Sequence, residues 1–147
     1  MGCKVNVFIA RHCEKSNLRQ DCTPFGMEHA EYFASLFGDN DERWPAPSRL
    51  YARAEESPKF VKRSHETLIP IAEKFNLEII DDYGTTNKKE MISEIFEGMQ
   101  DGSLCGHLVI INWKHENVPK IARGLGCGPL EGCPIELEPW DYDFLWR

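Results

Sequence analysis

Residues 7 to 20, VFIARHCEKSNLRQ, contain two side chains that could attack a phosphorus atom. If His12 is the nucleophile, Arg11 beside it would bind the phosphate oxygens, because a guanidinium presents a planar pair of donors. If Cys13 is the nucleophile, the pattern is Cys-x5-Arg, a phosphate-binding loop that ends at Arg19. Both chemistries pass through a covalent phosphoryl intermediate. The stretch therefore indicates phosphoryl transfer and leaves the attacking atom open.

The residues between Cys13 and Arg19 weaken the cysteine alternative. A Cys-x5-Arg loop must turn several backbone N–H groups toward one phosphate, which requires glycine or small residues. The interior here is Glu-Lys-Ser-Asn-Leu, with no glycine. Glu14 would also repel a phosphate dianion. In favour of the alternative, the chain length and the N-terminal position of the loop resemble the low-molecular-weight cysteine-dependent tyrosine phosphatases.

The hydrophobic pattern predicts strands that alternate with helices. Runs rich in apolar residues predict strands at residues 4–10, 49–54, 77–80, 107–113 and 142–147, of which 4–10 is also rich in β-branched residues. Helical patterns occupy residues 23–38, where Thr23 is a predicted N-cap, and residues 61–75, 88–99 and 116–126. This order predicts one domain over residues 1–147 with an α/β fold: a three-layer α/β/α sandwich around a mostly parallel sheet.

Two histidines follow strands that are far apart in the sequence. Arg11 and His12 come directly after the first strand, and Lys114 and His115 come after the strand at 107–113. Ligands of open α/β sheets bind at the carboxyl ends of the strands. We therefore expect His12 and His115 to meet at one crevice.

Four stretches, in one order, resemble the histidine phosphatase superfamily, the phosphoglycerate mutase-like proteins. RHCEK resembles the family's Arg-His-Gly-Glu motif, and CTPFGMEHAEYFASLF resembles its Leu-Thr-x-x-Gly helix through Thr23, Gly26 and Ala30. SPKFVKRSHET resembles its Ser-Pro…Arg-x-x-Gln-Thr segment through Ser57, Pro58, Arg63 and Thr67. LVIINWKHENVPKIARGLG is similar to its late strand, second histidine and helix. The cysteine alternative gives no role to Arg63 or His115.

The resemblance implies a role for each matching residue. His12 would be the nucleophile and form a phosphohistidine that water then hydrolyses. Arg11 and Arg63 would bind the phosphoryl oxygens, and His115 would donate a hydrogen bond to them. Glu14 would orient an arginine or His12. From the loop residues themselves, Asn17 is a further candidate phosphate donor.

Three features depart from the family pattern. Four residues separate Pro58 from Arg63, where the family has about two. Cys13 stands where the family has glycine, so we expect backbone strain at that turn. Many members carry a glutamate as general acid after the third strand, where this chain offers only the candidates Asp81, Asp82 and Glu90. Short members without that acid act on phosphohistidine or other good leaving groups, and this chain resembles them.

Composition limits the partners. The net charge of -7 argues against sequence-independent nucleic-acid binding, which requires a basic surface. No run of 18 apolar residues is present, so we expect no membrane span. The expected substrate is a small phosphorylated molecule or a phosphoprotein. A non-catalytic protein that binds a phosphorylated ligand is the remaining alternative.

The six cysteines include no Cys-x2-Cys pair and have no histidine at zinc-finger spacing. We therefore predict no metal and no other cofactor. Without a recognisable export signal, we expect reduced thiols and a cytoplasmic protein.

Overall fold

The computed structural model describes residues 3–13, 22–39, 42–54, 63–84, 86–131 and 145–146, with the backbone alone at His115, Pro129, Leu145 and Trp146. Its strands are β1 (Asn6–Arg11), β2 (Arg49–Ala52), β3 (Ile79–Ile80), β4 (Leu108–Trp113) and β5 (Leu145–Trp146). Its helices are α1 (Pro24–Ser35), α2 (Arg63–Phe75), α3 (Lys88–Gln100) and α4 (Val118–Gly124), with short 3-10 turns η1 (His115–Asn117) and η2 (Pro129–Glu131).

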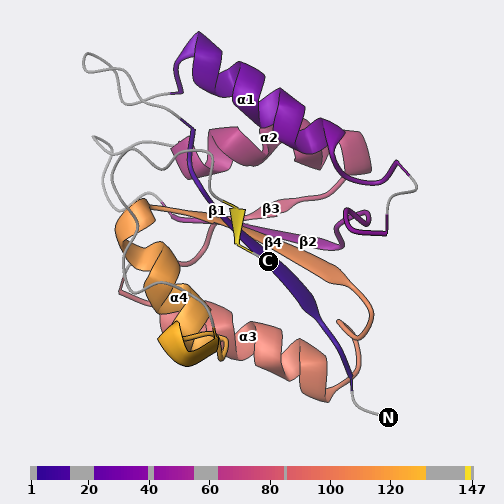
Figure 1. Ribbon diagram of the computed structural model, residues 1–147, viewed down its shortest axis with the longest axis vertical. Coiled ribbons are helices and arrows are strands. Elements are labelled where there is room, and N and C mark those ends of the chain that lie inside the picture. The colour runs from indigo at the N-terminus through magenta and orange to yellow at the C-terminus, as the bar shows by residue number, and fades with distance from the viewer. Residues whose placement is uncertain are drawn as a thin grey trace.

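The strands form one sheet in the order β3-β2-β4-β1-β5. β1, β2, β3 and β4 run parallel, and β5 pairs antiparallel with β1. Helices α1 and α2 lie over one face of the sheet and α3 and α4 over the other (Figure 1). The predicted α/β class and the three-layer, mostly parallel architecture are confirmed.

Alternate residues of each strand supply the two halves of the core. On β4, Leu108 and Ile110 pack with the α1 and α2 layer, whereas Val109, Ile111 and Trp113 pack with the α3 and α4 layer. This is the two-residue period of a strand, whose side chains point to opposite faces in turn. All six residues of β4 are buried because the strand has neighbours on both edges and helices on both faces.

Helix ends follow local chemistry. The Thr23 hydroxyl accepts a hydrogen bond from the Gly26 N–H at 2.9 Å, and Pro24 occupies the first helical position of α1. Pro70 lies inside α2, which nevertheless continues to Phe75. Asn76 follows with a φ of 53°, the left-handed conformation that commonly ends a helix. Within the described residues, no helix is both long and apolar enough to cross a bilayer.

Disulfide bonds correct the expectation of reduced thiols. Cys3 is bonded to Cys105 and Cys13 to Cys22, and Cys127 is disulfide-bonded as well. The Cys3–Cys105 and Cys13–Cys22 pairs are separated by 102 and 9 residues, with Cα–Cα distances of 5.0 and 5.6 Å. Cysteine spacing alone does not show which chain segments the sheet will bring together, and for that reason the prediction was wrong.

The two located bridges lie at opposite ends of the sheet. Cys3 and Cys105 precede β1 and β4, where the Gly106 N–H also donates to the Lys4 carbonyl at 2.7 Å. Cys13 follows β1 at its carboxyl end, and its bond to Cys22 ties that end to the start of α1. Only the second bridge is adjacent to the predicted nucleophile.

Replacing Cys3 and Cys105 together by serine should lower the free energy of unfolding by about 3–5 kcal/mol, because the bridge closes a long loop in the unfolded chain. Urea unfolding followed by circular dichroism measures the difference. With dithiothreitol present, parent and variant should unfold at the same urea concentration. Equal midpoints without the reductant would show that the bridge does not stabilise the fold.

Candidate functional site

The sheet's connections diverge at the carboxyl ends of the neighbouring strands β1 and β4. The chain after β1 enters α1 on one face, and the chain after β4 enters α4 on the other (Figure 1). The two strands are in register, with Arg11 opposite Trp113, and the His12 N–H donates to the Trp113 carbonyl at 3.2 Å. Such a switch point is the usual ligand site of a parallel sheet. The predicted catalytic segments therefore begin side by side.

His12 is buried, with 6% of its surface exposed, and its ring is fixed by a hydrogen bond. Nδ1 lies 2.7 Å from the carbonyl oxygen of Cys13. A carbonyl can only accept, so Nδ1 carries a proton, and in the neutral ring Nε2 then carries the lone pair. The backbone at Cys13 thus selects the tautomer that a nucleophilic Nε2 requires.

Thr67 joins α2 to the residue after His12. Its hydroxyl accepts a hydrogen bond from the Cys13 N–H at 2.8 Å and donates one to the Arg63 carbonyl at 2.6 Å. Two hydrogen bonds therefore connect the backbone beside the predicted nucleophile to the backbone of Arg63, the predicted phosphate-binding residue. Arg63 itself is the first residue of α2 and is half-buried.

The other strand ends bring further basic residues. Arg11, the last residue of β1, is buried, with 5% exposed, and its carbonyl accepts from Asn112 Nδ2 at 3.2 Å. Arg53 follows β2 directly, and its N–H donates to the Asn112 carbonyl at 3.2 Å. Asn112 is fully buried in β4. The sequence showed it only as the one polar residue in an apolar strand.

His115 begins η1, two residues beyond Trp113, and the turn is closed by the Asn117 N–H donating to the Lys114 carbonyl at 3.0 Å. Its backbone thus follows the strand that pairs with β1, as predicted. The His115 side chain lies outside the described part of the structure, as do Glu14, Asn17 and Arg19. Their predicted contacts with a phosphate remain predictions.

The three candidate acids lie at the far edge of the sheet or on α3. Asp81 follows β3 and pairs with His65, with Oδ2 3.0 Å from Nδ1. Asp82 is exposed in the same segment, which reaches the end of β2 where the Ala54 N–H donates to the Tyr83 carbonyl at 2.8 Å. Glu90 is exposed in the first turn of α3. None of the three contacts His12 in the interactions described.

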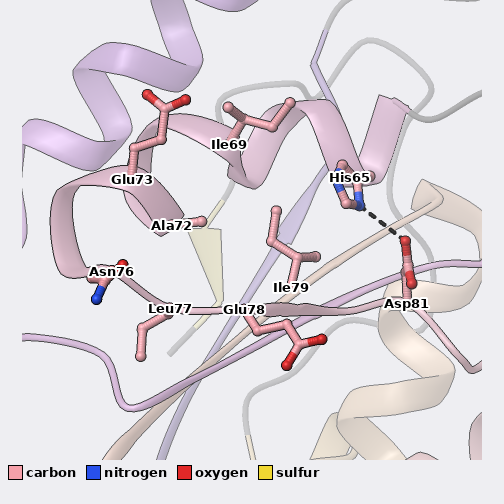
Figure 2. A pocket seen from close by; sticks show the side chains of 9 residues that line it. All are labelled: His65, Ile69, Ala72, Glu73, Asn76, Leu77, Glu78, Ile79 and Asp81. Carbon is pink, nitrogen blue, oxygen red and sulfur yellow. Dashed lines mark hydrogen bonds and ion pairs between the residues drawn. The ribbon is translucent and has the colours of Figure 1, made fainter.

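A groove of about 510 Å³ opens between α2 and β3, and Figure 2 shows the His65–Asp81 pair at one end of it. Its lining is apolar from Ile69, Leu77 and Ile79 and acidic from Glu73 and Glu78. His12 does not line it. The groove is therefore separate from the carboxyl ends of β1 and β4, where His12 lies.

Two tyrosines near the end of β2 share one carboxylate. Burial, with a smaller contribution from Glu94, raises the pKa of Tyr51 to about 12 against the opposing hydrogen bond from Arg49. A hydrogen bond to Glu94 is the main cause of the raised pKa of Tyr83. Both phenols therefore stay protonated at neutral pH. They cannot provide a phenolate base.

The structure resolves two questions about Cys13. Among the described non-glycine residues only Asn76 has a positive φ, so the strain expected at Cys13 in place of glycine is absent. The Cys13 sulfur is bonded to Cys22, and sequence reasoning missed this partner. The described residues include no group of three or more side chains that could hold a metal ion.

No protein-family model and no curated protein matches this chain. Among solved structures, the alpha-ribazole phosphatase from Shigella flexneri is similar with a TM-score of 0.47 and 15% identity, over 88% of this chain and 81% of that one. A similarity of this size carries no information about the reaction. Conclusions about chemistry therefore depend on the site itself.

Changing Thr67 to valine should lower the free energy of unfolding by about 1–3 kcal/mol, because it leaves the buried Cys13 N–H without its acceptor. Thr67→Ser keeps the hydroxyl and should lose clearly less. Urea unfolding of the two variants under oxidising conditions measures both values. Equal losses would mean that the methyl group of Thr67, rather than its hydroxyl, stabilises this region.

Proposed function

We propose that this protein is a phosphatase of the histidine phosphatase type, a phosphoric monoester hydrolase. Its substrate would be a phosphate ester or a phosphoramidate, and its intermediate a phosphohistidine on His12. The observation that carries the proposal is the Nδ1–H of buried His12 donating to the Cys13 carbonyl at 2.7 Å. In the neutral ring that bond leaves the lone pair on Nε2, at the switch point of the sheet, which supports His12 as the nucleophile.

In the first step, Nε2 of His12 attacks phosphorus, the bond from phosphorus to the leaving oxygen or nitrogen breaks, and its electron pair goes to the leaving group. Charge on the transferring phosphoryl group must be met by fixed donors. Arg11 and Arg63 are the proposed donors, with Asn17 and His115 completing the set. Glu14 would orient one of the arginines or His12.

In the second step, water attacks the phosphohistidine, the P–N bond breaks, and His12 recovers its lone pair. A leaving group that is already a weak base, such as the imidazole of phosphohistidine, needs little help from an acid in the first step. Such substrates therefore fit a site whose general acid the sequence does not identify. Asp82, next to the segment that reaches the end of β2, is the acid candidate best placed by the backbone.

Bonding of Cys13 to Cys22 weakens the cysteine phosphatase alternative. A cysteine nucleophile must be a free thiolate. The Cys13 sulfur cannot form a thiolate while it is bonded to Cys22. The expectation of a cytoplasmic protein rested on reduced thiols, and the bridges remove that support. We therefore propose no compartment and retain a small phosphorylated molecule or a phosphoprotein as the partner.

His12→Ala should lower kcat/KM for para-nitrophenyl phosphate at least about a thousandfold, because it removes the nucleophile. The matched control is His107→Ala, since His107 is an exposed histidine at the amino end of β4, bonded to Ser48. Its activity should stay within about twofold of the parent. The parent, quenched during turnover of a 32P-labelled substrate, should carry label that is lost in acid and kept in alkali.

The alternatives give different results in the same assays. Activity that survives His12→Ala and disappears in Cys13→Ser would identify a cysteine phosphatase. A parent that binds tungstate but releases no phosphate from any ester or from phosphohistidine would be a phospho-ligand-binding protein. Either result would overturn the proposal.

A further inference from the structure

The bridge between Cys13 and Cys22 lies between the two parts of the proposed phosphate site. Its Cys13 end supplies the carbonyl that holds the His12 ring at 2.7 Å and the N–H that donates to Thr67 at 2.8 Å. Its Cys22 sulfur lies 3.8 Å from the Arg63 carbonyl oxygen and 3.9 Å from Thr67 Oγ1. One covalent link thus contacts both the backbone that orients the nucleophile and the helix turn that starts with Arg63.

In the oxidised state, the two sulfur contacts are not hydrogen bonds donated by Cys22, because a bonded sulfur carries no proton. The Thr67 hydroxyl is then left to donate to the Arg63 carbonyl and to accept from the Cys13 N–H. After reduction, the new Cys22 thiol has a proton within reach of both acceptors. It would compete for the same oxygens while the position of Cys13 is no longer fixed covalently.

The two sulfurs differ in access. Cys13 is buried, with 5% exposed, whereas Cys22 is partly exposed. A thiolate of an external dithiol can therefore approach the Cys22 sulfur. Exchange there forms a mixed disulfide with Cys22 and breaks the bond to Cys13, which leaves as a thiolate. The second thiol of the reductant, as its thiolate, then displaces Cys22, so the reductant ends as a disulfide and both cysteines as thiols after taking up protons.

The phosphoryl transfer proposed above makes no use of the Cys13–Cys22 bond, so its position beside His12 calls for another role. We propose that this disulfide is a modification site for dithiol reductants that sets the activity of the His12 centre. The oxidised protein binds phosphate and turns over, and reduction weakens both. This inference rests on the proposed function and adds a way in which that function is regulated.

The test compares the oxidised protein with the same protein treated with dithiothreitol and checked by alkylation and mass spectrometry for reduction at Cys13 and Cys22. Reduction should lower kcat/KM for para-nitrophenyl phosphate about tenfold, the scale expected when a catalytic group is displaced slightly. Affinity for tungstate, measured by calorimetry, should fall in parallel. Reoxidation should restore both.

Two variants assign the effect to this bridge. Cys22→Ser leaves Cys13 in place and should behave like the reduced parent, with no further response to dithiothreitol. Cys3→Ser combined with Cys105→Ser removes the bridge at the opposite end of the sheet and should keep the full response. Circular dichroism verifies that each variant is folded. The comparison of the oxidised and reduced parent requires no substitution and so does not depend on any variant folding.

The possible results distinguish the modification site from the proposed phosphatase activity. A parent with equal activity and equal tungstate affinity in both states overturns the modification site and leaves the proposed phosphatase standing. A parent without phosphatase activity that nevertheless binds tungstate more weakly after reduction refutes the enzyme and supports the site. Reduction that raises activity, with dependence on Cys13 and none on His12, would overturn the inference and identify the cysteine mechanism. Tungstate binding in neither state would overturn both.

Discussion

Burial of β4 is the constraint on which the rest of the structure depends. All six residues of β4 are buried, so the strand must be flanked by β1 and β2 and covered by helices on both faces. Its in-register pairing with β1 brings Arg11 opposite Trp113. The chain leaves β1 toward α1 and β4 toward α4, so the ends of these two strands form the switch point of the sheet. The position of His12 follows from these requirements.

At this switch point, the backbone groups of Cys13 position the predicted nucleophile. The Cys13 carbonyl fixes the His12 tautomer, and the Cys13 N–H is held by Thr67. A threonine suits this place because one hydroxyl can accept from Cys13 and donate to Arg63 at the same time. The α2 turn and the β1 end are therefore positioned together, although 54 residues separate them in the sequence.

Sequence reasoning identified the features that depend on local pattern. The buried run before Arg11, the Thr23 cap and the alternation of strands with helices all follow from residue period and from end chemistry. Pairings that depend on folding were not visible: the bond from Cys13 to Cys22, and the engagement of Asp81 with His65. The strain expected at Cys13 was inferred from glycine in the family motif. The backbone there takes a negative φ that a side chain accepts.

A protein of net charge -7 that binds a phosphate dianion must rely on where its charges lie. At physiological salt, charges separated by more than about 8 Å in water are largely screened. The end of β1, the residue after β2 and the start of α2 are each an arginine: Arg11, Arg53 and Arg63. Arg11 is nearly inaccessible to water, so its field is screened less than that of a surface charge. Under the proposed function, a buried charge such as that of Arg11 would therefore act on the phosphate more strongly than distant surface carboxylates do.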